Sequence, residues 1–186
     1  MKLARYLAPV LAFAAVGQAQ AAQAQQACIA PADLGDTMIY AMPIAYDAAR
    51  TACARQLRSD GFLARGGERF VSGFRARQNA AWPGAFRTMK VLLAEESARA
   101  KAGNFDVLAL VQSMPEANLR PFVDGLMGQM IAEEIKPESC GKIERGMELL
   151  SPLPVDNVAG LMGFVVALMG LDKPAICPAA FTRNRR

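Results

Sequence analysis

A run of fourteen residues, VAGLMGFVVALMGL at 158–171, constrains the fold most, because every residue in it is apolar or glycine. Such a run has to leave water, in a membrane, among other helices or against a partner. As a helix it would rise about 21 Å, whereas the hydrocarbon core of a bilayer is about 30 Å thick. Asp156 and Asp172 close the run on its two sides. We therefore expect the most buried helix of a bundle, rather than a membrane span or an exposed docking surface, and we do not expect an integral membrane protein.

The N-terminus has the three-part layout of a secretory signal peptide. Lys2 and Arg5 are followed by an apolar run at 7–16 and then by a tract of small residues. Two A-x-A sites lie at 19–21 and 22–24, and we expect cleavage after Ala24. This predicts a signal peptide at 1–24 and a periplasmic or secreted protein. Residues 25–186 would form a single helical domain, with 183–186 as a disordered basic tail.

Four cysteines remain after this cleavage: Cys28, Cys53, Cys140 and Cys177. An even number of cysteines in an exported chain predicts two disulfides, and four cysteines allow three pairings. A helix over 138–150, a reversing turn and a returning helix over 158–171 would bring Cys177 back beside Cys140. We therefore expect the pairs Cys140–Cys177 and, by elimination, Cys28–Cys53.

Helical periodicity dominates the chain. No segment shows a convincing alternation of apolar and polar residues, which is typical of strands. The stretch 33–57 is predicted to be helical, and 60–67 is predicted to be a connecting loop. Further helices are expected where apolar residues recur at three and four, or cover most sides of the segment, at 68–80, 86–98, 105–114, 120–135 and 138–150. The predicted fold is all-α, a single-domain bundle of about seven short helices stabilised by two disulfides.

Prolines set several of the expected helix boundaries. Pro43 should interrupt or kink its helix, because it lacks a backbone donor and crowds the preceding turn. Pro83 and Gly84 are expected to separate two helices. Pro121 suits the first position of a helix, where its missing N–H costs nothing.

The composition excludes several common chemistries. The chain has no histidine, which removes the usual serine and cysteine triads and histidine-ligated metal sites. Without residues 1–24 it keeps 19 basic and 17 acidic residues, which is no polybasic excess. We expect no catalytic residue, no cofactor, no metal site and no nucleic-acid partner.

Charge is distributed unevenly along the chain. Residues 50–90 include nine basic and two acidic residues, whereas 102–172 include four basic and ten acidic ones. The two halves could pack together and neutralise each other, or the arginines could form an exposed face. The candidates for that arginine-rich face are Arg50, Arg55, Arg58, Arg65, Arg69, Arg75 and Arg77. An exposed face predicts a non-enzymatic binding or interaction module whose partner is an anionic lipid surface or an acidic protein.

One alternative is enzymatic. Glu95-Glu96-Ser97, followed by GLMGQM at 125–130, partly resembles the E-S and G-L-M-Q elements of lytic transglycosylases. Those enzymes are helical and exported, and they use a single glutamate as general acid/base. The resemblance implies a peptidoglycan-active hydrolase that uses Glu96. Gly128 interrupts the second element, and the spacing between the two elements is longer than in that family.

Methionines suggest the other alternative. Nine follow Met1, and the pairs Met38/Met42 and Met127/Met130 are spaced by about one helical turn. Thioethers can bind Cu(I), but these residues fall on predicted core stripes, where methionine is an adaptable filler. A pocket among them would make the protein a carrier of an apolar ligand.

Overall fold

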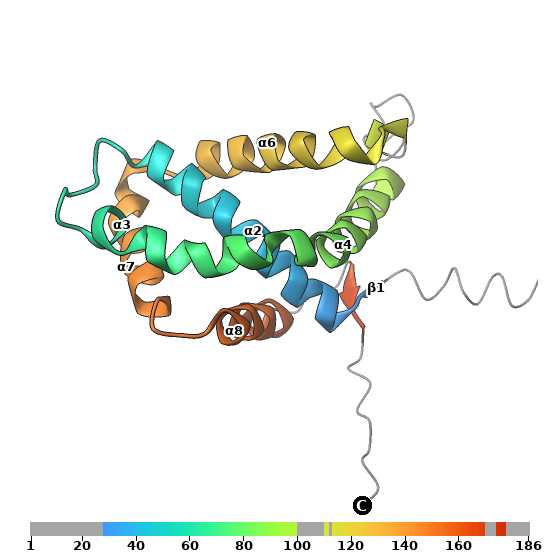
Figure 1. Cartoon of the computed structure of the whole chain (residues 1–186). Helices are drawn as coiled ribbons and strands as arrows, with labels where there is room; N and C mark the ends of the chain where they lie inside the picture. The colour runs from blue at the N-terminus through green and yellow to red at the C-terminus, as the bar shows by residue number, and fades with distance from the viewer. Residues whose placement is uncertain (1–27, 100–109, 112, 170–173, 178–186) are drawn as a thin grey trace, which may run out of the picture.

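Helix α2 (Pro31–Ala52) lies at the centre of the fold. Three other helices pack against it: α4 (Gly67–Arg99), α6 (Glu116–Glu134) and α8 (Val155–Leu168). Figure 1 shows α2 crossing the middle of the bundle, with α6 on one side and α8 on the other. The computed structural model describes residues 28–99, 110–111, 113–169 and 174–177.

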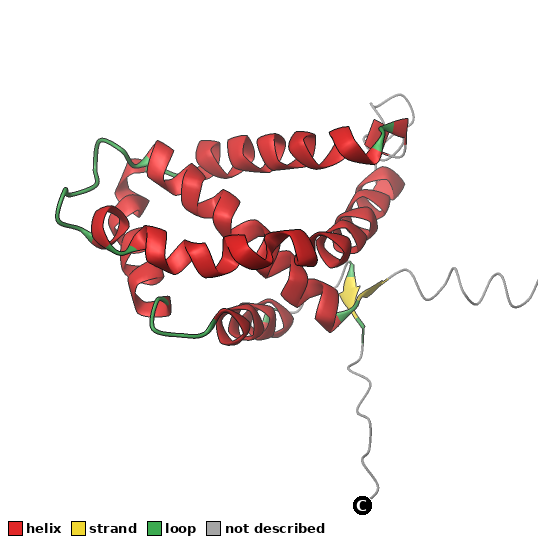
Figure 2. Ribbon diagram, in the orientation of Figure 1, coloured by secondary structure: helices red, strands yellow, loops and turns green. Residues whose placement is uncertain are grey.

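The remaining elements are short. Two short helices are α3 (Phe62–Arg65) and α7 (Cys140–Leu150), so the described residues form six α-helices. A 3-10 turn at Pro137–Ser139 precedes α7. Strands β1 (Cys28–Ile29) and β2 (Ala175–Ile176) form a small parallel pair (Figure 2). The all-α prediction is confirmed. The strand pair, and the short α3 within the predicted loop at 60–67, were not predicted.

Three prolines lie inside helices. Helices α4 and α6 are longer than predicted, whereas α2 ends at Ala52 and not at the predicted residue 57. α2 runs through Pro43, α4 runs through Pro83, and α6 begins five residues before Pro121. The break expected at Pro83 and Gly84 and the start expected at Pro121 are therefore wrong. Packing holds the turns around these prolines: Pro43 is itself buried, and Trp82 beside Pro83 is buried in the core. Figure 1 shows α4 changing direction along its length, as proline-containing helices do.

Several predictions fall on residues that are not described. The signal peptide at 1–24 and the basic tail at 183–186 lie outside the described residues, and so does most of the helix expected at 105–114. They stay predictions.

Two hydrophobic clusters form the core, and α2 contributes to both. Tyr40 and Ile44 belong to the first cluster, with Trp82 of α4. Tyr46 and Ala49 belong to the second cluster, with members from α3, α4, α7 and α8. Tyr40 and Tyr46 are fully buried, and the Tyr40 ring lies 5.0 Å from the Trp82 ring between centroids. α2 is thus held from both sides.

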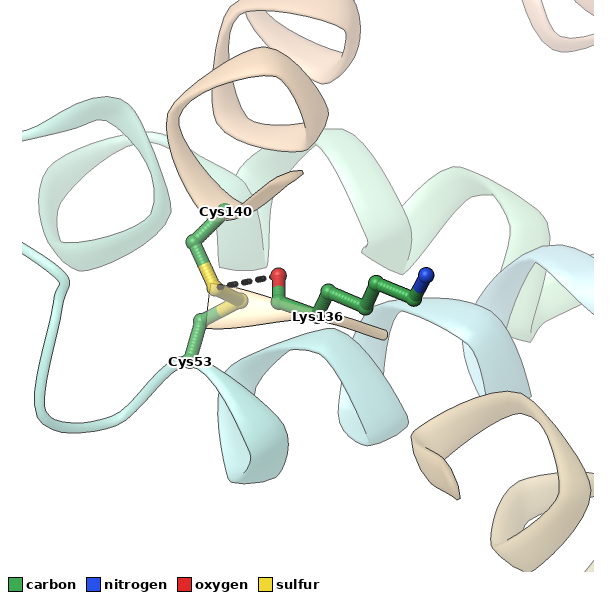
Figure 3. Close-up of a disulfide and its surroundings, with 3 residues drawn as sticks. All are labelled: Cys53, Lys136 and Cys140. Atoms are coloured by element: carbon green, nitrogen blue, oxygen red, sulfur yellow. Dashed lines mark hydrogen bonds between the residues drawn. A yellow bond between two sulfur atoms is a disulfide. The ribbon is translucent and has the colours of Figure 1, made fainter. Parts of the chain in front are cut away.

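Two disulfides close the fold. Cys53, directly after α2, is bonded to Cys140 at the start of α7, with a Cα–Cα distance of 5.6 Å (Figure 3). Both residues are buried, and the carbonyl oxygen of Lys136 lies 3.9 Å from Cys140 Sγ. The second bond joins Cys28 of β1 to Cys177, directly after β2.

The number of disulfides was predicted correctly, but the pairing was wrong. The expected Cys140–Cys177 bond requires the helix after α7 to run back along it. Instead α8 packs mainly on α2, and β2 lies beside β1. There Cys28 pairs in register with Ala175, and the Cys177 N–H donates to the Ile29 carbonyl at 2.9 Å. The start of α7 is left next to Cys53.

Helix α8 is not the most buried helix, which corrects a second expectation. Val158 and Ala159 are buried, but Phe164 is 59% exposed and Leu168 is 69% exposed. The reason is that α8 packs on α2 through one face only and lies at the edge of the bundle (Figure 1). An apolar run shows that a helix can be buried, but not how many neighbours cover it.

Among the described helices, none is both long enough and apolar enough to cross a membrane.

The two disulfides should differ in their contribution to stability. Removing either one costs about 2–4 kcal/mol by freeing the unfolded chain. The loop closed by Cys28–Cys177 is longer, 149 residues against 87, which favours that bond by only about 0.5 kcal/mol. Replacing Cys53 and Cys140 also removes two buried sulfur atoms from the core. The free energy lost in this way is larger than the difference due to loop length. We therefore expect Cys53→Ala/Cys140→Ala to be about 1 kcal/mol less stable than Cys28→Ala/Cys177→Ala in urea unfolding. The reverse order would contradict the buried position of the Cys53–Cys140 bond.

Candidate functional site

An apolar pocket of about 280 Å³ lies between α2, α4 and α6. Its walls are Thr37 and Tyr40 from α2, Trp82, Ala85, Thr88, Met89, Leu92 and Leu93 from α4, Val111, and Phe122, Val123, Leu126, Met127 and Met130 from α6. Helices α4 and α6 both pack on α2 but have few close backbone contacts with each other. The space between them is the pocket.

Helical spacing places these side chains. The lining residues of α4 recur at three and four from Trp82 to Leu93, and those of α6 recur in the same way from Phe122 to Met130. Each helix therefore presents one apolar stripe to the gap.

The pocket has a buried floor and an exposed rim. Tyr40, Trp82 and Val123 are buried, whereas Leu126 is 42% exposed and Met130 is 57% exposed. Large apolar side chains that stay in contact with water are unfavourable unless something covers them. Covering the rim with a ligand would therefore remove the largest exposed apolar surface of the site from water.

Polar contacts behind the pocket fix the Tyr40 ring in its floor. The Tyr40 hydroxyl donates a hydrogen bond to Asp124, and the Arg120 guanidinium carbon lies 5.5 Å from the centre of the Tyr40 ring. Arg120 also donates to Asn79 Oδ1 at 2.6 Å. Burial, followed by the hydrogen bond to Asp124, raises the pKa of Tyr40 well above its ordinary value. Tyr40 thus stays neutral, and its hydroxyl proton is already donated to Asp124.

Thr88 is the polar exception in the walls. It is 3% exposed, and its Oγ1 is the one buried side-chain oxygen or nitrogen in the described part of the chain with no hydrogen-bond partner. The other threonine of the pocket differs, because Thr37 donates to the Asp33 carbonyl at 2.6 Å. Unpaired buried hydroxyls are rare and costly, so this one requires an explanation.

The described walls of the pocket carry no formal charge. None of the described residues that line it is Asp, Glu, Lys or Arg. The nearby cations are engaged elsewhere: Lys90 Nζ lies 4.9 Å from the centre of the Phe86 ring, and Arg120 contacts Asn79.

All seven predicted arginines are exposed, but four of them have carboxylate partners. Arg50 and Arg75 both pair with Glu68, and Arg75 also pairs with Asp47 at 2.6 Å. This group of two arginines and two carboxylates has no net charge. Burial acts to raise the pKa of Glu68, but the hydrogen bond and charge of Arg75 lower it below its ordinary value.

The other predicted arginines are divided between paired and unpaired. Arg58 pairs with Asp60 and Arg77 pairs with Asp156. Among the described residues, no ion pair involves Arg55, Arg65 or Arg69. Nearby carboxylates therefore pair with four of the seven arginines. Binding of these arginines to an anionic lipid surface or an acidic protein stays a prediction.

The residues of the transglycosylase resemblance fall in two places. Glu96 belongs to α4, but its side chain lies outside the described part of the structure. Leu126, Met127 and Met130 of the second element line the apolar pocket. Hydrolysis by Glu96 stays a prediction.

The methionines are also divided. Met89, Met127 and Met130 line the pocket, whereas Met42 packs against the second core cluster. Within the described ranges, no group of three Cys, Asp or Glu residues is placed to hold a metal ion.

Comparison with known proteins gives no further assignment, since no protein family, curated protein or solved structure matches the chain.

Replacing Thr88 with valine should stabilise the protein. Thr88→Val keeps the branched shape and removes a buried hydroxyl that has no partner, so we expect a gain of about 1 kcal/mol. For a chain of this size that raises Tm by about 2–4 °C. Differential scanning calorimetry measures it, with Thr51→Val as control, because the exposed Thr51 hydroxyl bonds to the Asp47 carbonyl at 2.9 Å. A Tm below that of the wild type would show that Thr88 has a stabilising partner.

Proposed function

We propose that this protein binds a small apolar molecule in the pocket between α2, α4 and α6, without transforming it chemically. The observation that carries the proposal is the form of the pocket. Its described lining includes no charged residue and leads to a rim of exposed apolar side chains, which are Leu92, Phe122, Leu126 and Met130. Ligand sites in proteins are concave, mostly apolar and largely formed before binding.

The energetics of the pocket favour this function. Water in a space lined by hydrocarbon and aromatic side chains finds few hydrogen-bonding partners, so an apolar ligand that displaces it gains free energy. Burial yields about 25 cal/mol for each Å² of apolar surface removed from water. A ligand in this pocket removes both its own surface and the exposed rim.

The size of the pocket limits the ligand. A volume of about 280 Å³ is just below the usual range of ligand pockets, which is about 300 to 1,000 Å³. Met89, Met127 and Met130 widen the choice, because methionine side chains adapt to different shapes. This supports a small, flexible ligand and some tolerance among related molecules.

Binding of a fluorescent apolar probe tests the proposal. N-phenylnaphthylamine is neutral and becomes brighter in an apolar environment, so we expect saturable enhancement with the wild-type chain. Leu126→Lys places a charge at the rim and removes apolar contact, which should weaken binding about tenfold.

A matched variant on α8 provides the control. Leu161 is 44% exposed, close to the 42% of Leu126, but it is not part of the pocket. Leu161→Lys should leave the affinity for the probe within about twofold of the wild type. If Leu161→Lys abolished binding and Leu126→Lys did not, the apolar face of α8 would be the binding surface and the pocket would not.

A further inference from the structure

The unpaired hydroxyl of Thr88 indicates which chemical group the ligand carries. Threonines in helices commonly bond to the carbonyl four residues earlier, as Thr37 and Thr51 do on α2 at 2.6 and 2.9 Å. Thr88 has no such bond, although it is buried and lines the pocket. Its hydroxyl can both donate and accept, so an oxygen of a bound molecule could satisfy it in either direction.

The absence of charge in the walls limits that group further. A carboxylate or ammonium moved into the pocket would lose its hydration, and no described lining residue carries the opposite charge. A neutral oxygen loses much less hydration free energy when it enters the pocket. The Tyr40 hydroxyl cannot donate to that oxygen, because its proton already goes to Asp124.

We infer that the ligand is a neutral molecule with an apolar body and one hydroxyl, ester or ketone oxygen, which hydrogen-bonds to Thr88 inside the pocket. This inference rests on the proposed function and adds the chemical class of the ligand. The apolar body contacts the stripes of α4 and α6, and the oxygen lies at the buried end.

Three probes of equal chain length separate these contributions. Decanol, decane and decanoate each compete with N-phenylnaphthylamine, and the displacement curves give their affinities. We expect decanol to bind more tightly than decanoate, since a charged head cannot reach Thr88 without losing its hydration. One hydrogen bond to Thr88 should change the ratio of decanol to decane affinity by between about twofold and tenfold.

Variants of Thr88 test this bond directly. Thr88→Val should lower the ratio of decanol to decane affinity by that two- to tenfold factor while leaving decane binding intact. Thr88→Ser keeps a hydroxyl and should keep most of the preference. Thr51→Val removes an exposed threonine hydroxyl outside the pocket and should leave the ratio unchanged.

The outcomes distinguish failure of the inference from failure of the proposed function. If decane and decanol displace the probe but Thr88→Val does not change their ratio, the pocket binds apolar molecules and the role of Thr88 is wrong. If decanoate binds as tightly as decanol, the head group lies at the rim and the inference is also wrong. If the probe itself shows no saturable binding and none of the three molecules binds, both the inference and the proposed function are wrong.

Discussion

Burial of α2 from both sides is the interaction on which the rest of the structure depends. Tyr40 and Ile44 pack in one hydrophobic cluster, while Tyr46 and Ala49 pack in the other. Because α4 and α6 are both anchored to α2, they need no extensive contact with each other. The gap that results is lined by the apolar stripes of both helices and forms the pocket. Its floor belongs to the buried core, so the site is part of the framework that stabilises the fold.

Covalent bonds reinforce this arrangement at two distant places. Cys53–Cys140 fixes the end of α2 to the start of α7, and Cys28–Cys177 joins the strands β1 and β2. Neither bond touches the pocket, whose walls come from α2, α4, α6 and Val111. The unpaired Thr88 hydroxyl in the wall of the pocket costs the fold some stability.

Local sequence patterns predicted most of the helices and the number of disulfides. They left open whether the arginines are exposed or neutralised by the other half of the chain. Features that depend on long-range packing were missed. The pairing of Cys140 depends on the direction that α8 takes after the turn, and periodicity says nothing of that direction. Pro83 lies within a helix because buried Trp82 and Ala85 hold the turns around it.

The pocket is a gap between two helices, so no single segment encodes it. The spacing of Met127 and Met130 did suggest an apolar pocket among the methionines, and both residues line it. Nothing in the local sequence singles out Thr88, because its lack of a partner is a property of the folded surroundings.

Fluorescence of the single tryptophan tests the central claim most directly, since Trp82 lines the pocket and no other tryptophan contributes to the signal. Bromine quenches indole fluorescence only at close range, so a brominated alkane bound in the pocket has to quench Trp82. Our account predicts that bromodecane quenches the emission saturably, approaching one equivalent per chain, and that decanol reverses the quenching. Emission that is unaffected by bromodecane, or that falls linearly without saturation as in free collision, would contradict it.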